Sequence, residues 1–203
     1  MSKIILVRHG ETQFNVEGRV QGWLDSPLTQ NGIEELNRQA RELKDEFSCV
    51  YSSPSMRAVK SALILSSCNK RAISLITCDE LKEMHFIPWE GRLISEVSNT
   101  GFPSDFSTYR NEPEKFVPAA GESFAEVKAR AVKIIRKIAL ENKDKTVLVV
   151  SHVAAISNII NYFAGGEIKD LWKYKVRSAS LTELYFEGDK FIKFGRIAYI
   201  DKR

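Results

Sequence analysis

The chain has 203 residues, of which 43% are hydrophobic and 28% charged, as in ordinary folded proteins and unlike disordered ones. Its net charge is +4, but the 30 basic residues are scattered among 26 acidic ones, which argues against nucleic acid as a partner. No run approaches the roughly 18 apolar residues that span a bilayer, and Ile4–Val7 is too short for a signal peptide. We expect one domain over residues 1–203, located in the cytoplasm, without membrane partners.

The three cysteines, Cys49, Cys68 and Cys78, are odd in number and widely spaced, and no histidine lies near them. This pattern favours small buried apolar side chains over a disulfide framework or a zinc site. We therefore predict no metal site.

Strands and helices alternate in the predicted structure. The first and fourth strands are continuous apolar runs, as expected for strands buried on both faces. The last two strands flank a hairpin-like turn at Glu187-Gly188-Asp189. The predicted strands cover residues 4–7, 50–51, 73–76, 146–150, 180–186 and 190–200.

Helical spacing of apolar residues predicts four helices between these strands. The first follows Thr29 as N-cap and carries apolar residues as far as Phe47. The second begins at Pro54, the third covers about 123–140, and the fourth follows His152 and stops at Gly165-Gly166. The alternation predicts an α/β fold, a sandwich with a mostly parallel sheet and an edge hairpin.

The segment from about 88 to 121 differs from the rest of the chain. It holds four of the six prolines and has little periodicity. We predict that it forms a small cap of loops and short helices over one end of the sheet.

Two histidines and two arginines stand at predicted strand ends. His9 and His152 each follow an apolar strand, Arg8 precedes His9, and Arg57 lies in the first turn of the helix after the second strand. Ligands of open α/β sheets bind beyond the carboxyl ends of the strands. A cationic spot there, beside helix N-termini, favours a phosphoryl group. Each residue alone has an ordinary alternative, either a hydrogen-bonded structural histidine or a surface ion pair worth under about 1 kcal/mol.

The string Leu6–Thr12, in which Arg-His-Gly follows the first strand, resembles the signature of the histidine phosphatase superfamily. Five further blocks resemble the family in the same order, so the resemblance covers nearly the whole chain. It implies a three-layer α/β/α sandwich like that of phosphoglycerate mutase. The five blocks are Gln21–Thr29, Tyr51–Ala58, Leu81–Gly91, Gly121–Phe124 and Val150–His152.

The sequence departs from the family pattern at two places. Val153-Ala154 stands where the family often has Gly-Gly, which we expect to narrow the pocket floor. Phe86-Ile87-Pro88 stands where a glycine usually precedes the Trp-Glu-Gly element, which we expect to redirect the cap. Neither change removes a group that does chemistry.

The resemblance also assigns roles to individual residues. It makes His9 the nucleophile and Glu83 the proton donor, with Glu11 and Glu90 as weaker candidates for the acid that we interpret as structural. It implies that the phosphate is bound by Arg8, Asn15, Arg57 and His152, and that the substrate pocket includes Gln21, Gly22 and Val153. It implies no cofactor and no metal.

The implied activity is hydrolysis of a small phosphorylated metabolite through a phosphohistidine, by a monomer or a homodimer. Phosphoglycerate mutases of the family have a longer insertion than Arg92–Ala120. The shorter segment favours an open site, where water reaches the phosphohistidine. Two alternatives stay open: a cofactor-dependent phosphoglycerate mutase, and a catalytically silent phospho-ligand-binding protein. The second would not need the acid Glu83. The substrate also stays open, with broad-specificity and α-ribazole phosphatases both in the group.

Overall fold

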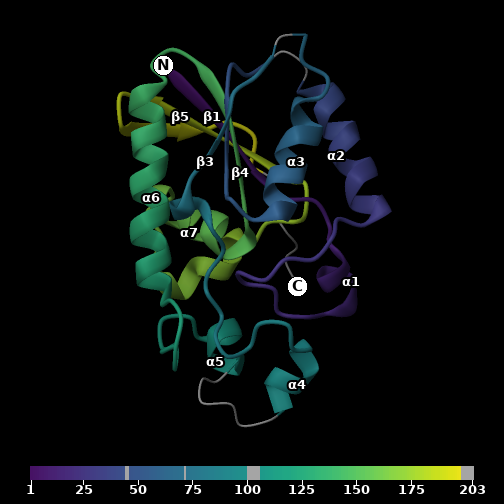
Figure 1. Ribbon diagram of the computed structural model, residues 1–203. Coiled ribbons are helices and arrows are strands. Elements are labelled where there is room, and N and C mark those ends of the chain that lie inside the picture. Colours follow the sequence, from purple (N-terminus) through teal and green to yellow (C-terminus); the bar gives the residue numbers. More distant parts are fainter. Residues whose placement is uncertain (44–45, 71, 100–105, 198–203) are drawn as a thin grey trace.

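A computed structural model describes residues 1–43, 46–70, 72–99 and 106–197. Six strands form one sheet in the order β3-β2-β4-β1-β5-β6 (Figure 1). The four strands from β3 to β1 are parallel, and β5 and β6 add an antiparallel hairpin at the edge, which confirms the predicted sheet. The strands are β1 (Ser2–Arg8), β2 (Val50–Ser52), β3 (Leu75–Thr77), β4 (Thr146–Ser151), β5 (Leu181–Glu187) and β6 (Lys190–Phe194).

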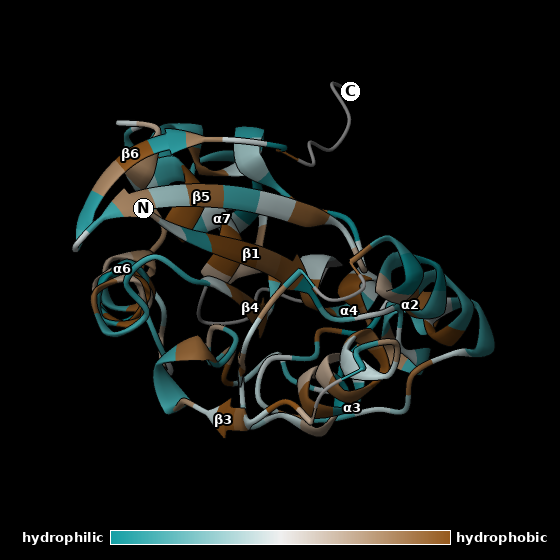
Figure 2. Cartoon of the chain, turned by 90° about the horizontal axis from the view of Figure 1, so that it is seen from above, coloured by the Kyte–Doolittle hydropathy of each residue, from teal (hydrophilic) through white to brown (hydrophobic). Residues whose placement is uncertain are grey.

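Helices cover both faces of the sheet. On one face, α2 (Gln30–Glu42) and α3 (Met56–Ser66) enclose a core with one set of strand side chains. On the other, α6 (Phe124–Glu141) and α7 (Val153–Phe163) enclose a second core. Figure 2 shows β1 and β4 hydrophobic over most of their length, as strands buried between two helical layers must be. The expected α/β/α sandwich is confirmed.

The strand register places the predicted site residues next to one another at the carboxyl ends of β1, β2 and β4. Arg8 pairs with Ser151 across β1 and β4, and Ser52 of β2 pairs with Val150. Beyond the strands, the His9 backbone N–H donates to the Ser151 carbonyl at 3.0 Å. His9 and His152 therefore leave the sheet side by side, at the carboxyl ends of neighbouring parallel strands.

The cap lies beyond that end of the sheet (Figure 1). It contains α4 (Ile94–Asn99) and α5 (Phe106–Asn111), and residues 100–105 of the predicted insertion lie outside the described residues. A third core of aromatic side chains, centred on Trp89 and Tyr109, joins the cap to Phe124 at the start of α6. The remaining short elements are α1 (Gln13–Glu17) and the 3-10 helices η1 (Asp79–Leu81) and η2 (Ile168–Tyr174).

Several predicted boundaries were wrong. The first long helix ends at Glu42, and Phe47 is buried without belonging to it. α3 begins at Met56 instead of Pro54, because Asp25 accepts the backbone N–H groups of Met56 and Arg57 and so fixes the start of the helix.

The last strand and the cysteines also differ from the prediction. β6 ends at Phe194, six residues earlier than predicted, although Gly195 still pairs with β5 through its N–H, which donates to the Glu183 carbonyl at 3.0 Å; residues 198–200 lie outside the described range. The cysteines are unpaired, as predicted, but each is partly exposed instead of buried.

Candidate active site

His9 is held in an orientation suited to nucleophilic attack. Its side chain is 3% exposed, and Nδ1 lies 2.7 Å from the Gly10 carbonyl oxygen. Because a carbonyl only accepts hydrogen bonds, Nδ1 carries the proton and Nε2 keeps its lone pair. Burial, with the charges of Arg57 and Arg8, holds the pKa of His9 well below its ordinary value. The imidazole is therefore neutral at neutral pH.

His152 faces His9, with ring centroids 5.1 Å apart. It is fully buried and forms the N-cap position of α7. Burial first, then the charges of Arg57 and the neighbouring site residues, hold the pKa of His152 well below its ordinary value. His152 was expected to belong to a cationic spot, but in the structure it is a neutral imidazole that donates from one nitrogen, so the positive charge comes from the arginines.

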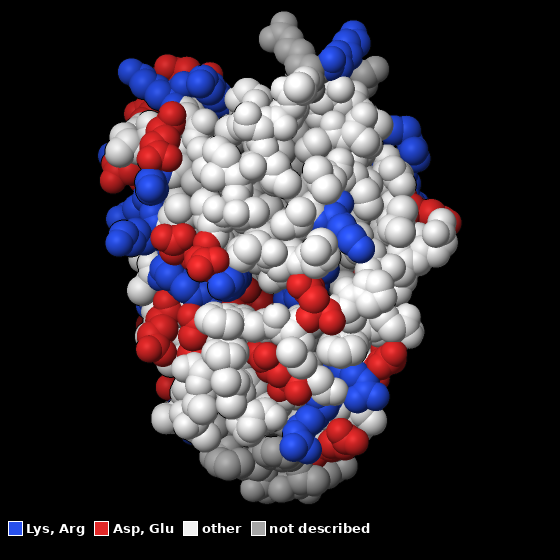
Figure 3. All heavy atoms as spheres, viewed as in Figure 1, with Lys and Arg blue, Asp and Glu red and all other residues white. Residues whose placement is uncertain are grey.

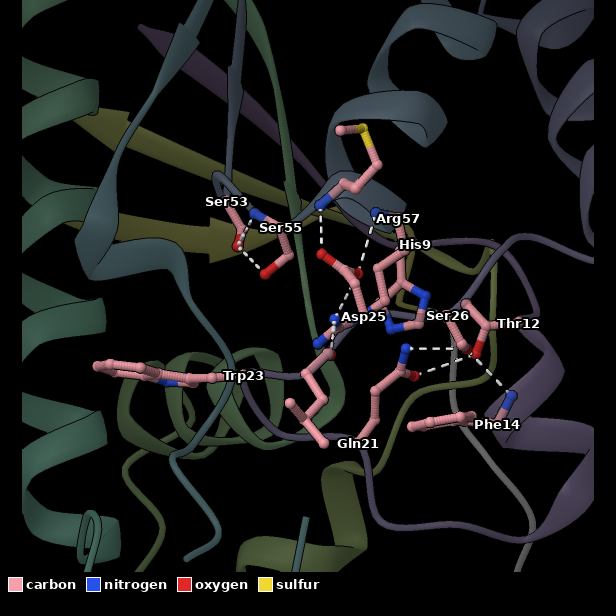
Figure 4. A network of polar contacts seen from close by, with 12 residues as sticks. His9, Thr12, Phe14, Gln21, Trp23, Asp25, Ser26, Ser53, Ser55 and Arg57 are labelled. Carbon is pink, nitrogen blue, oxygen red and sulfur yellow. Dashed lines mark hydrogen bonds and ion pairs between the residues drawn. The ribbon is translucent and has the colours of Figure 1, made fainter. Parts of the chain in front are cut away.

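Arg57 is fixed by three acceptors from one loop. Nη1 donates to Asp25 Oδ1 at 2.8 Å (Figure 4). Nη1 also donates to the Leu24 carbonyl at 2.7 Å, and Nη2 donates to the Gly22 carbonyl at 2.7 Å. A guanidinium has five N–H groups. Nε–H and one Nη2–H remain, which are adjacent donors that suit a bidentate contact with a phosphoryl group.

Four buried nitrogen atoms at this end of the sheet have no hydrogen-bond partner within the described residues. They are Nε of Arg8, Nε of Arg57, and Nδ1 and Nε2 of His152. Arg8 is anchored through Nη1, which donates to the Val176 carbonyl at 3.0 Å. Buried polar atoms are normally paired. Three of these nitrogens can donate, Nε of each arginine and one nitrogen of the neutral His152, and together they suit a ligand with several acceptor oxygens.

Glu83 is 5% exposed, and its carboxylate lies at the N-terminus of α7. Oε1 accepts the backbone N–H groups of Met84 at 2.9 Å, Ala154 at 3.1 Å and Ala155 at 3.3 Å. From the described residues, Oε2 accepts only the Ala154 N–H, at 3.3 Å. Oε2 is therefore the oxygen with capacity left to exchange a proton.

Other predicted residues hold the surrounding loops. Asn15 forms a capping box with Thr12, so its Oδ1 is engaged and only Nδ2 is left to donate to a phosphate. Gln21 accepts from Thr12 Oγ1 at 3.0 Å and donates to Ser26 at 3.1 Å (Figure 4). Gly22 contributes its backbone carbonyl, which accepts a hydrogen bond from Arg57 Nη2. Val153 is partly buried and packs against the core under α6 and α7.

The alternative acids have structural contacts. Glu11 accepts from the Thr29 hydroxyl at 2.7 Å, which braces the start of α2. Glu90 accepts the backbone N–H groups of Trp23 and Phe86, at 2.9 and 3.0 Å. Each carboxylate therefore ties two loops together.

Sequence reasoning missed two residues of this region. Asp25 fixes Arg57 from a position 32 residues earlier, and no local pattern marks such a contact. The second is Tyr109 of the cap: burial and then the charge of Glu83 raise the pKa of its phenol well above the ordinary value, while the charge of Arg8 lowers it. The phenol of Tyr109 is therefore neutral at neutral pH.

The described part of the chain holds no group of three or more His, Cys, Asp or Glu side chains placed to bind a metal ion. Within the same residues, no helix is long and apolar enough to cross a membrane. Figure 3 shows acidic and basic side chains interspersed on the face in view, without a continuous basic patch there.

The two histidines predict how stability depends on pH. Their folded pKa values lie below the unfolded value of about 6.5. Below pH 6.5 the unfolded chain therefore binds more protons than the folded one, and stability falls. The free energy of unfolding should fall by up to about 1.4 kcal/mol per pH unit for each histidine. Urea unfolding between pH 8 and 5 measures this slope. His152→Gln should make it shallower, and an unchanged slope would contradict the burial of a neutral His152.

Comparison with known proteins places the chain in a family. The profile of the histidine phosphatase superfamily (branch 1) matches residues 4–194, so the chain belongs to that superfamily. Phosphoserine phosphatase 1 of Hydrogenobacter thermophilus is 31% identical, over 92% of this chain and 88% of that protein. The adenosylcobalamin/alpha-ribazole phosphatase of Escherichia coli is 29% identical, over 86% and 85%.

Solved structures agree with this assignment. YhfR of Bacillus stearothermophilus superimposes with a TM-score of 0.88 at 30% identity, covering 98% of this chain and 96% of that one. Phosphoserine phosphatase of Entamoeba histolytica, solved with 3-phosphoglyceric acid, gives 0.80 at 28% identity, covering 97% and 98%. The family and these relatives support phosphatase activity for the chain.

Proposed function

We propose that this protein hydrolyses a small phosphorylated metabolite through a phosphohistidine on His9, without a metal. The observation that carries the proposal is the neutral His9, with Nδ1 tied to the Gly10 carbonyl, among four unpaired buried nitrogens of Arg8, Arg57 and His152. A nucleophile with a free lone pair and donors for several oxygens are what phosphoryl transfer requires.

In the first step, the lone pair of His9 Nε2 attacks phosphorus, the N–P bond forms and the P–O bond to the leaving group breaks. Glu83 Oε2 gives its proton to the leaving oxygen. The Gly10 carbonyl stabilises the positive charge that the attack places on the Nδ1–H side of the ring. Arg8, Arg57 and His152 stabilise the equatorial oxygens, so the chain supplies the positive charge itself.

In the second step, water attacks phosphorus and the N–P bond breaks. Glu83, now a carboxylate, takes a proton from that water. Inorganic phosphate leaves, and His9 returns to its neutral state with Nδ1 still protonated. The same carboxyl group thus serves as acid and then as base.

The test is release of inorganic phosphate from p-nitrophenyl phosphate and from a panel of alkyl phosphates. The relatives' names suggest phosphoserine and α-ribazole phosphate, and 3-phosphoglycerate tests for the mutase. We expect phosphate release at equal rates with and without EDTA. Loss of activity in EDTA, restored by magnesium or manganese, would contradict metal independence. No release from any substrate would favour the silent phosphate-binding protein, and conversion of 3-phosphoglycerate to its isomer would favour the mutase.

A further inference from the structure

Arg130, a side chain of α6, forms hydrogen bonds with the backbone of the segment 80–85, which we call the Glu83 loop. All five N–H groups of the Arg130 guanidinium are used. Nη1 donates to the carbonyls of Glu80 and Lys82, at 2.8 and 2.7 Å. Nη2 donates to the Glu83 carbonyl at 3.0 Å and to Glu122 at 2.8 Å, and Nε donates to Glu122 at 2.7 Å.

Glu122 holds the other end of the same loop. Its Oε2 accepts the His85 backbone N–H at 3.1 Å, and its own N–H donates to the His85 carbonyl at 3.1 Å. The side chains of Arg130 and Glu122 are each only 18% exposed. The pair is therefore a largely buried, bidentate ion pair that binds the backbone on both sides of Glu83.

The Glu83 side chain depends on that backbone for its position. Its carboxylate reaches the N-terminus of α7, where Ala154 and Ala155 donate to Oε1. Trp23 Nε1 also donates to the Glu83 carbonyl, at 2.9 Å. Proton transfer to a leaving oxygen needs a geometry accurate to a fraction of an ångström, and a misplacement of about 1 Å can cost 100-fold in rate.

We propose that Arg130, together with Glu122, is a positioning residue that acts through Glu83, and the inference rests on the proposed function. Among the residues that the structure describes, Arg130 forms no hydrogen bond with His9, Arg8 or Arg57, and its five hydrogen bonds end on the Glu83 loop or on Glu122. A lysine has three donors and lacks the planar fork, so it cannot satisfy these acceptors together.

The test compares Arg130→Lys with Arg136→Lys, the same change on an exposed arginine of the same helix, where it contacts the Tyr162 hydroxyl. The rate of phosphoenzyme formation is measured in single turnovers with p-nitrophenyl phosphate and with the alkyl phosphate that the panel shows to react fastest. For Arg130→Lys we expect a loss of up to about 100-fold with the alkyl phosphate. The nitrophenyl ester, whose leaving group needs no proton, should react at close to the wild-type rate. Arg136→Lys should change neither rate.

Combination with Glu83→Gln shows whether Arg130 acts through Glu83. If it does, Arg130→Lys should slow the alkyl phosphate little further in the Glu83→Gln protein, because the two changes remove one function. Equal losses on both substrates, additive losses, or no loss in a folded Arg130→Lys protein would each overturn the proposal. If Arg130→Lys does not fold, the same rates are measured for Glu122→Gln, which keeps the side-chain shape. The same results are then expected, and the same results would overturn the proposal. Failure of the wild-type protein to hydrolyse any substrate would instead remove the proposed function.

Discussion

His9→Ala should lose turnover by about 10⁴-fold or more, the scale seen when a catalytic nucleophile is removed. The structure gives the reason: His9 is the side chain whose imidazole is kept neutral by burial and oriented by the Gly10 carbonyl. Phosphate release under steady-state conditions measures the loss. Circular dichroism and thermal unfolding check that the variant is folded, because the substitution empties a buried position.

His152→Ala is the matched control. His152 is equally buried, but in this account it only donates to the phosphoryl oxygens. Removal of one such donor typically costs about 10²–10³ in rate, less than removal of the nucleophile. If His9→Ala keeps most of the rate and His152→Ala does not, the two roles are reversed.

Glu83→Gln should slow the hydrolysis of an alkyl phosphate by roughly 10²–10⁴, the usual range for general acid catalysis. An alkoxide leaves poorly without a proton, whereas nitrophenolate is stable enough to leave without one. The variant should therefore form the phosphoenzyme from p-nitrophenyl phosphate at nearly the normal rate. It should then turn over slowly, because activation of water is also impaired. Stopped-flow absorbance would show a burst of nitrophenol followed by a slow phase.

The structure makes glutamine a well-matched substitution. Its amide oxygen can accept the same N–H groups from Met84, Ala154 and Ala155 that Glu83 Oε1 accepts. Only the oxygen that exchanges protons is replaced. If Glu83 is merely a loop residue, both substrates should react at near wild-type rates. Equal losses on both, in a stably folded variant, would remove Glu83 from the acid role and direct attention to Glu11 or Glu90.

The location of the site can be predicted from the sequence, because its residues directly follow predicted parallel strands. Parallel strands place their carboxyl ends at one edge, so His9 and His152 had to lie close together once their apolar runs were recognised as strands. The same rule placed Arg57 nearby. These predictions need only local patterns and a general property of parallel sheets.

The contacts that orient these residues cannot be predicted from local sequence patterns. Asp25 holds Arg57 across 32 residues, and Arg130 holds the Glu83 loop across 47. A charged residue's partner depends on the tertiary fold, and most charges in this chain lie on exposed surface. The helix α1 has only five residues and shows no periodicity, so it was missed, although the Thr12–Asn15 capping box marks its start.

The central claim, a phosphohistidine on His9, is tested most directly by trapping the intermediate. The Glu83→Gln protein is mixed with ³²P-labelled p-nitrophenyl phosphate, whose leaving group needs no proton, quenched in alkali within milliseconds, digested and mapped by mass spectrometry. We predict an acid-labile, alkali-stable label on the peptide that contains His9, absent when His9→Ala is added. Turnover without any labelled protein, or a label on the peptide that contains His152, would contradict the account.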